Sequence, residues 1–296
     1  MNYRSEVSLN AYQLWVRMTI SIAEWRYQSK KTLKSFSESA EYDVNIILCK
    51  VLNKDLNWCL ANSEKLLPEN EIIWLTEKLE ELKKGAPLAY VVGGTHFFES
   101  RIIVDKNVLI PRSETEIMVE TALDWISNHP KIEKIVDVGT GSGAIVLSVM
   151  KKYPNLIGFG TDTSKNALNV AQKNMKLLQI DKLFLIQMDC LSAVKTKFDV
   201  ILANLPYIPK EEVKRLKVTK YEPLQALDGG KMGVEIIFKL IDQIPSCLSK
   251  PGLAILEIQY DQAMIVVEKV NQIFPESSVS ILKDYAGLNR FIKIEV

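Results

Sequence analysis

The sequence predicts an α/β protein in which an N-terminal all-helical domain precedes a doubly wound sheet of seven strands. Three observations predict this fold class. Up to about residue 85, apolar residues recur at helical spacing without a competing strand pattern. From residue 113 onward, short apolar strands alternate with amphipathic helices, as in parallel sheets that helices cover. A glycine-rich turn joins the first of these strands to the helix after it.

The N-terminal domain is expected to span residues 1–85 and to be all-helical. Its apolar residues form two stripes at helical spacing: Val44, Ile47, Leu48, Val51 and Leu52, followed by Ile72, Leu75, Leu79 and Leu82. Such a stripe lets a helix bury one face while the other face stays in water. We therefore expect this domain to have an apolar core of its own.

Residues 86–112 are expected to form a hairpin linker. Pro87 and the pair Gly93–Gly94 interrupt the helical pattern. The run 101–110, which is rich in valine and isoleucine, then has the composition of a strand or a hairpin connector. The boundary of the first domain is therefore placed near residue 86.

Residues 113–296 are expected to form a Rossmann-like α/β domain. Helices are expected over residues 114–125, from Ala144 onward, and through residues 168–178. The expected strands are Lys134–Val138, Leu156–Gly160, Leu183–Met188, Phe198–Ala203, Gly252–Ile258, Val279–Leu282 and Arg290–Glu295. Because helices separate most of these strands, the sheet is predicted to be doubly wound.

Composition excludes several classes of protein. The 296 residues include 37 basic and 36 acidic side chains, a net charge of +1, so no stable nucleic-acid binding is expected. Four cysteines without a C-x-x-C pair and only two histidines make a zinc site unexpected. Thiols without a pattern indicate a reducing compartment. No apolar run reaches the about 18 residues of a membrane span, since Arg17 breaks the best candidate, residues 12–23. We expect a cytoplasmic protein.

The turn after the first predicted strand has the composition of a cofactor-binding loop. It consists of Gly139, Thr140, Gly141, Ser142 and Gly143. Glycine permits a tight turn and lets a ligand approach the backbone N–H groups at the start of a helix. The loop therefore predicts a site for an adenosine-containing cofactor. Because it also fits the dinucleotide pattern G-x-G-x-x-[GA], an NAD enzyme remains an alternative at this point.

Acidic residues end the second and third predicted strands. Asp162 is placed where a carboxylate can accept hydrogen bonds from both ribose hydroxyls. Asp189 can accept a hydrogen bond from the amino group of an adenine, and Cys190 would then lie beside the ring. Asp162 could instead cap the following helix, and Asp189 could be a surface acid. Both positions suit any adenosine-containing cofactor, so they do not decide between the alternatives.

The fourth predicted strand ends in a tetrapeptide that indicates the chemistry. It consists of Asn204, Leu205, Pro206 and Tyr207. The Asn204 side-chain oxygen and the Leu205 carbonyl can accept the two hydrogens of a planar NH2 group, and Tyr207 can stack on its π face. Two such acceptors direct the nitrogen lone pair at an electrophile such as a sulfonium methyl group. An NAD enzyme gives this loop no role, so we favour methyl transfer, which positioning alone can accelerate.

With these residues in view, the sequence resembles the class I S-adenosylmethionine-dependent methyltransferases, and specifically the PrmC/HemK family. That family methylates the glutamine side chain in the Gly-Gly-Gln loop of peptide chain release factors. Further blocks that carry the resemblance are Pro87–Tyr90, Val108–Glu116, Glu222–Pro223, Ala226–Gly230, Leu256–Ile258 and Asp284–Arg290. The helical first domain is similar to the family's release-factor-docking module. The resemblance thus covers most of the chain.

The resemblance implies a role for each candidate residue. Residues 139–143 would line the methionine end of S-adenosylmethionine, Asp162 would hold its ribose, and residues 189–190 would flank its adenine. Residues 204–207 would hold the substrate glutamine, with Asn204 also facing the cofactor. The implied partners are release factors, which are the protein substrates. We expect the enzyme to be a monomer and to need no metal.

Three departures from the family pattern bear on this reading. Leu205 replaces the usual proline, Ser113 replaces a proline in the linker block, and Cys190 replaces the tryptophan beside the adenine. Asn-Leu-Pro-Tyr is also the spelling found in rRNA adenine dimethylases, so methylation of an adenine amino group in rRNA or DNA remains the alternative. The Arg112 and Glu114 side chains are expected to brace the pocket, although a purely structural ion pair is an alternative.

Overall fold

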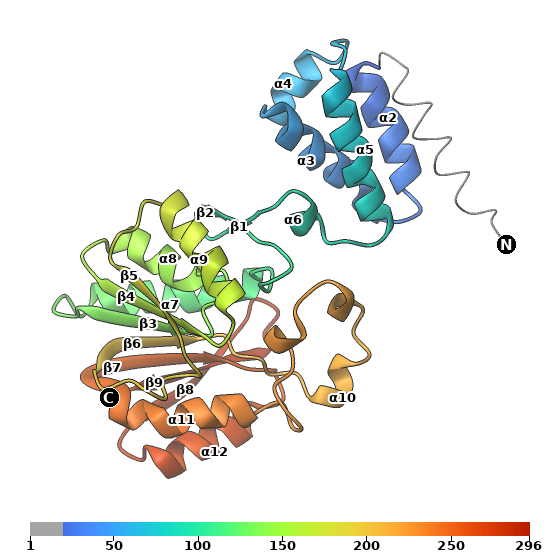
Figure 1. Ribbon diagram of the computed structural model, residues 1–296. Helices are drawn as coiled ribbons and strands as arrows, with labels where there is room; N and C mark the ends of the chain where they lie inside the picture. The colour runs from blue at the N-terminus through green and yellow to red at the C-terminus, as the bar shows by residue number, and fades with distance from the viewer. Residues whose placement is uncertain (1–19) are drawn as a thin grey trace. The chain divides into compact units, whose positions relative to one another are not determined.

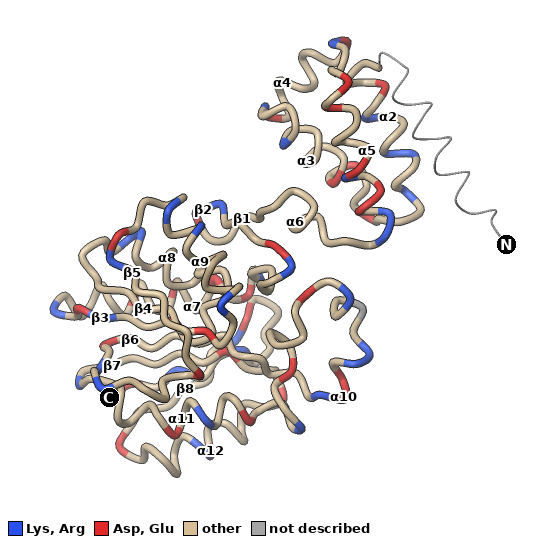
Figure 2. The backbone as a smooth tube through the Cα atoms, in the orientation of Figure 1, with Lys and Arg blue, Asp and Glu red and all other residues tan. Residues whose placement is uncertain are grey.

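The computed structural model describes residues 20–296, which divide into two compact units between Gly93 and Gly94 (Figure 1). The start of the predicted helical domain, and with it residues 12–19 of the apolar run, lies outside the described residues. Within residues 20–296, no helix combines the length and the apolar character needed to cross a bilayer. Acidic and basic residues are interspersed along both units (Figure 2).

The first unit is helical, and its helices bury the predicted stripes. The helices are α2 (Ile22–Leu33), α3 (Ala40–Leu52), α4 (Leu56–Ala61), α5 (Glu69–Lys83) and α6 (Leu88–Val91). In α3 the first three stripe residues are buried, whereas Val51 and Leu52 are half-buried. All four stripe residues of α5 are buried. Together with Trp25 of α2, they form a core that belongs to this unit alone.

The second unit opens with a short hairpin and an irregular segment. Strands β1 (Thr95–Phe97) and β2 (Ser100–Ile102) pair in antiparallel fashion. Residues 103–112 then run without a helix or strand to the short helix η1 (Ser113–Thr115). The Val- and Ile-rich run 101–110 therefore contributes only its first two residues to a strand.

A sheet of seven strands forms the centre of the second unit. Its strands are β3 (Lys134–Val138), β4 (Ile157–Asp162), β5 (Leu183–Gln187), β6 (Phe198–Ala203), β7 (Leu248–Glu257), β8 (Ser278–Lys283) and β9 (Asn289–Glu295). They lie in the order β5-β4-β3-β6-β7-β9-β8, with β3 to β7 parallel and β9 antiparallel to both of its neighbours. The predicted doubly wound sheet is confirmed.

Helices cover both faces of this sheet (Figure 1). One face carries α7 (Glu116–Ser127), α8 (Ala144–Lys152) and α9 (Lys165–Leu177), and the other carries α11 (Glu235–Cys247) and α12 (Ala263–Ile273). Strands β3 and β6 and the second half of β7 are almost fully buried between these layers, which explains why they are nearly continuous apolar runs in the sequence.

Strand β7 begins four residues before its predicted start at Gly252. Its first part contains Ser249, Lys250 and Pro251, which are atypical of a central strand. The ladder with β6 is irregular at this point, because its register shifts between Phe198 and Val200. Such a strand start depends on the partner strand and has no local sequence signal.

The order in which successive strands are added to the sheet reverses at β3, and this topological switch point positions the site. After β3 the chain moves outward to β4 and β5, and it then returns to place β6 on the other side of β3. The loops after β3 and β6 therefore diverge, which opens a crevice at the carboxyl edge of the sheet. Val138 pairs with Ala203, so Gly139 and Asn204 leave the sheet at neighbouring positions.

The segment between β6 and α11 is long and mostly irregular. It contains only α10 (Lys210–Val213) and the short helices η2 (Lys217–Lys220) and η3 (Leu224–Ala226). A bridge between Ile208 and Asp228 closes its base. This segment supplies one side of the cavity described below.

Candidate active site

A cavity of about 660 Å³ opens at the carboxyl edge of the sheet. This volume lies in the range of about 300–1,000 Å³ that small-molecule sites occupy. The predicted site residues in its wall are Gly139, Thr140, Gly141, Ser142, Asp162, Asp189, Cys190, Asn204, Leu205 and Pro206. The structure therefore brings together residues from the ends of four parallel strands.

The glycine-rich loop is held in a conformation that requires its glycines. Gly139, Gly141 and Gly143 all have positive φ, at 72°, 55° and 80°. A Cβ on Gly139 would lie 2.8 Å from the Leu205 side chain, whereas a Cβ on Gly141 would meet nothing nearer than 3.9 Å. Thr140 is fixed by its hydroxyl, which donates to the buried carboxylate of Asp137 at 2.7 Å.

Gly143 is a predicted cofactor residue that does not contribute to the cavity wall. It is the N-cap of α8, and a Cβ there would lie 3.0 Å from Leu147 and 3.3 Å from Ala171. The structure gives this glycine a packing role, because its hydrogen atom allows α8 and α9 to pack closely behind the loop. Its contact with a cofactor stays a prediction.

Asp162 connects the glycine-rich loop to the end of β4. One carboxylate oxygen accepts from the Gly141 backbone N–H at 3.0 Å, and the other accepts from the Ser164 N–H at 2.8 Å. The N-cap of α9 is Ser164, whose hydroxyl accepts from the Ala167 N–H. Burial raises the pKa of Asp162. Each oxygen keeps a lone pair with which the carboxylate can accept a ligand hydroxyl.

Asp189 and Cys190 lie together at the end of β5. Asp189 is half-exposed and forms an ion pair with Lys239 of α11, and the hydrogen bond from this lysine lowers the pKa of the aspartate. Cys190 is buried, and burial raises the pKa of its thiol to about 12. A neutral thiol can pack against an aromatic ring. Lys239 is in the cavity wall and was not predicted from the sequence.

The tetrapeptide divides between the cavity and the interior. Asn204, Leu205 and Pro206 are in the cavity wall, but Tyr207 is not. The Tyr207 ring packs against the apolar core, and its hydroxyl lies 3.4 Å from a carboxylate oxygen of Glu257. Burial raises the pKa of this tyrosine to about 12. The predicted stacking of Tyr207 on a substrate NH2 group has no counterpart in this arrangement and stays a prediction.

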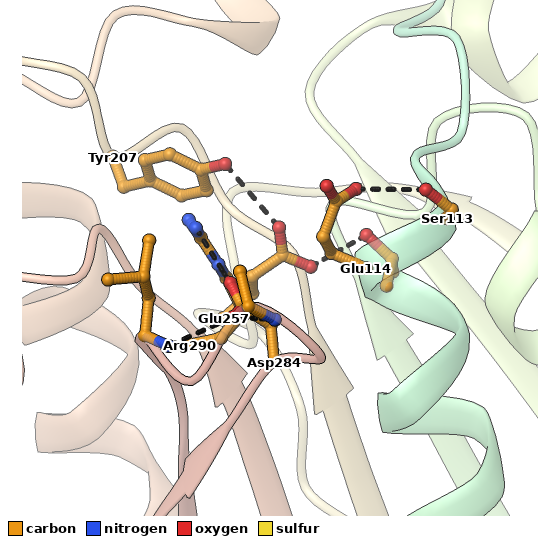
Figure 3. A network of polar contacts seen from close by, with 9 residues as sticks. Ser113, Glu114, Tyr207, Glu257, Asp284 and Arg290 are labelled. Carbon is orange, nitrogen blue, oxygen red and sulfur yellow. Dashed lines mark hydrogen bonds and ion pairs between the residues drawn. The ribbon is translucent and has the colours of Figure 1, made fainter.

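A partly buried ion pair ties the linker to the segment after β6. Arg112 Nη2 lies 2.6 Å from Glu222 Oε2, and the glutamate side chain is only 1% exposed. Burial raises the pKa of Glu222, and the nearby guanidinium acts in the opposite direction. Glu114 instead accepts a hydrogen bond from Ser113 at 3.2 Å (Figure 3). Since Pro223 is in the cavity wall, the Arg112 ion pair braces that wall from behind.

Asn174 is a structural residue of the site that was not among the predicted residues. Its Oδ1 accepts from the Ile103 N–H at 2.7 Å, and its Nδ2 donates to the Ile103 and Ser142 carbonyls at 2.9 Å each. The side chain is fully buried. It lies on the same face of α9 as Ala171, and a polar residue within an apolar stripe was the available signal.

We expect Asn174→Ala to lower the free energy of unfolding by about 2–4 kcal/mol, because the buried Ser142 carbonyl and two partly buried backbone groups of Ile103 lose their partner. Denaturant unfolding followed by circular dichroism measures this change. Asn169→Ala is the matched control, since Asn169 is exposed on the same helix and should change stability by less than about 0.5 kcal/mol. Equal effects of the two substitutions would contradict the structural role of Asn174.

Each of the two units matches a known protein family. A family model described as PrmC N-terminal domain matches residues 24–93, and one described as Methyltransferase small domain matches residues 115–221. A protein named Release factor glutamine methyltransferase from Bacillus cereus is 32% identical over 280 residues, covering 91% of this chain and 99% of that protein. The protein of the same name from Lactococcus lactis subsp. lactis is 37% identical over 246 residues, covering 82% and 89%.

A solved structure of ribosomal protein L11 methylase from Lactobacillus delbrueckii subsp. bulgaricus is also similar. It has a TM-score of 0.48 and 24% sequence identity, and the match covers 65% of this chain and 83% of that chain.

Proposed function

Because this chain belongs to the release factor glutamine methyltransferase family, we propose that its cavity binds S-adenosylmethionine and that Asn204 and Leu205 hold the substrate glutamine. The chain is a methyltransferase that acts on the side-chain nitrogen of a release-factor glutamine. The adenine amino-group alternative loses its support, because the relatives carry the release-factor name over nearly their whole length.

The residues of the cavity fit S-adenosylmethionine. The open side of Gly141 gives a ligand access to the loop backbone, and the Asp162 carboxylate has free lone pairs for ribose hydroxyls. The buried, neutral thiol of Cys190 suits one edge of an adenine. When bound, S-adenosylmethionine supplies a methyl group on a positively charged sulfur. Asp189 would reach the adenine amino group only through the oxygen that Lys239 leaves free.

The observation that carries the catalytic proposal is the position of Asn204 in the cavity wall beside Gly139. Its side-chain Nδ2 donates to Thr115 at 3.1 Å, which leaves Oδ1 available to accept a hydrogen. The Leu205 carbonyl is the second proposed acceptor for the NH2 group. Two acceptors that hold both hydrogens orient the nitrogen lone pair and raise its reactivity through positioning alone.

No residue of the site is assigned as a general base. Methylation leaves the amide nitrogen with an excess proton, which is acidic enough to leave to water without assistance. The Tyr207 hydroxyl of the tetrapeptide and the buried carboxylate of Glu257 contact each other instead. We therefore assign binding and orientation to the protein residues.

The helical first unit is proposed to dock the release factor. The support is the family match over residues 24–93, together with the exposed aromatic side chains of Tyr27, Phe36 and Tyr42. Release factors act with ribosomes, so we place the reaction in the cytoplasm. We propose that the enzyme works as a monomer without stable nucleic-acid binding.

The proposed function is tested by incubating the enzyme with labelled methyl donor and purified release factor. We expect label on the release factor and no label when the glutamine of its Gly-Gly-Gln loop is replaced by alanine. Ribosomal RNA serves as the second substrate control. Label on RNA alone would contradict the assignment, and undiminished label on the alanine variant would show that another residue is the acceptor.

A further inference from the structure

Two buried polar side chains lie behind Asn204 and were not part of the predicted site. Thr115 ends η1, and Glu257 ends β7. Both are 2% exposed. Because Ala203 pairs with Leu256 in the parallel ladder of β6 and β7, Asn204 and Glu257 lie next to each other at the carboxyl edge of the sheet. Thr115 comes to this point from the linker side, 142 residues before Glu257 in the chain.

These side chains form a continuous chain of hydrogen bonds. The Asn204 Nδ2 lies 3.1 Å from the Thr115 hydroxyl oxygen, and this hydroxyl lies 2.7 Å from Glu257 Oε2. The other carboxylate oxygen, Oε1, accepts from the Tyr207 hydroxyl at 3.4 Å. Figure 3 shows Glu257 between Tyr207 and the segment that carries Ser113 and Glu114.

The direction of each hydrogen bond follows from the chemistry of Glu257. An ionised carboxylate only accepts, so the Thr115 hydroxyl must donate its single hydrogen to it. The hydroxyl oxygen can then only accept a hydrogen bond from Asn204. It therefore faces the amide NH2 of Asn204 rather than the amide oxygen. The opposite side of the Asn204 amide, Oδ1, is thereby left for the cavity.

We propose that Thr115 and Glu257 are positioning residues that fix the amide orientation of Asn204, so that an acceptor faces the substrate nitrogen. This inference rests on the proposed function. With the amide reversed, Asn204 would offer NH2 to the substrate NH2, and the two donors would repel each other. The chain of hydrogen bonds therefore makes the site selective for a group that donates two hydrogens.

Charged and polar groups surround Glu257. Arg290 faces it from β9 and is fixed by Asp284, whose Oδ2 accepts from both Nε and Nη2 at 3.1 Å (Figure 3). Glu114 approaches from the linker side, and Tyr207 from the tetrapeptide. Burial raises the pKa of Glu257 to about 7, against the effects of the Thr115 hydrogen bond and the Arg290 charge.

The first test compares two substitutions of Thr115. Thr115→Val keeps the shape but removes the hydroxyl, and we expect kcat to fall about tenfold, the rate equivalent of one net hydrogen bond. The KM for S-adenosylmethionine should stay near wild type. Thr115→Ser keeps the hydroxyl and should restore kcat to within about twofold of wild type. A purely steric role would give the opposite order, with Val active and Ser impaired.

A double-mutant cycle with Asn204 separates positioning from other effects. If Thr115 acts only through Asn204, then Thr115→Val should cause no further loss of kcat in an Asn204→Ala background. An equal tenfold loss in both backgrounds would overturn the inference while leaving the proposed function intact. If Asn204→Ala alone left kcat unchanged, the proposed role of the tetrapeptide would itself be wrong.

The pH dependence of kcat provides a readout that does not depend on Thr115 variants folding. Protonated Glu257 donates to Thr115, which frees the Thr115 hydroxyl to donate to Asn204 and favours the reversed amide. Wild-type kcat should therefore fall as the pH drops through about 7. Glu257→Gln cannot titrate, so its profile should lack this fall. The same fall in Glu257→Gln would overturn the role assigned to Glu257.

Discussion

Replacing Asn204 with alanine is expected to lower the rate of methyl transfer by about two to three powers of ten, the size of effect seen when one positioned polar contact is removed at a reacting centre. The substrate NH2 would lose one of its two acceptors, and its lone pair would no longer be directed. Affinity for S-adenosylmethionine should stay near wild type, because the contacts proposed for Asp162 and the glycine-rich loop remain. Single-turnover methylation of the release factor and calorimetric binding of the cofactor measure the two quantities.

The change in cofactor affinity relative to the change in methylation rate shows whether Asn204 binds the substrate or the cofactor. Equal losses of cofactor binding and turnover would mean that Asn204 serves the cofactor rather than the substrate. Asn169→Ala is again the matched control, since it removes an exposed asparagine from a helix of the same unit. Its turnover should equal that of the wild type.

Gly233→Ala is expected to lower turnover about a hundredfold through displacement of the tetrapeptide. A Cβ at this position would clash with the Tyr207 carbonyl oxygen and would lie 2.8 Å from Gln262 Nε2. That same amide donates to the Tyr207 carbonyl at 2.8 Å and to the Gly233 carbonyl at 3.2 Å. The methyl group would therefore push the Gln262 amide and the Tyr207 carbonyl apart and break the hydrogen bond that fixes the end of the tetrapeptide. Steady-state methylation and the unfolding midpoint should both be measured.

Gly287→Ala is a control that matches Gly233→Ala in backbone strain. The two glycines have φ of 80° and 81°, but a Cβ on Gly287 would meet nothing within 4 Å. Both variants should lose about 1–2 kcal/mol of stability from the left-handed conformation. Only Gly233→Ala should lose turnover beyond that. Similar turnover in the two variants would show that the clash is absorbed without moving the tetrapeptide.

Much of the second unit was predictable because its strands are parallel and buried. A strand buried on both faces is a continuous apolar run, and the predicted runs 134–138 and 198–203 coincide with β3 and β6. The glycine-rich turn and the tetrapeptide follow directly after these two strands. Their convergence at one sheet edge follows from the fold class, so the part of the cavity wall that these two segments form was predictable from the sequence.

The parts that were not predictable depend on contacts between distant segments. Thr115 and Glu257 are 142 residues apart in the chain, and neither residue type indicates the pairing. Glu257 is nevertheless an acid inside an apolar strand, which is a sign that a partner must exist. Lys239 of α11 forms an ion pair with Asp189, which follows β5 and lies 50 residues earlier in the chain. The side chain of Tyr207 points to the core because Glu257 is there to accept its hydroxyl.

A structure of the enzyme bound to S-adenosylhomocysteine and a release factor tests the central claim most directly. We expect the glutamine NH2 nitrogen to lie within about 3.2 Å of both Asn204 Oδ1 and the Leu205 carbonyl oxygen, with its free face toward the cofactor sulfur. A glutamine amide that presents its oxygen to Asn204, or that binds outside this cavity, would contradict it.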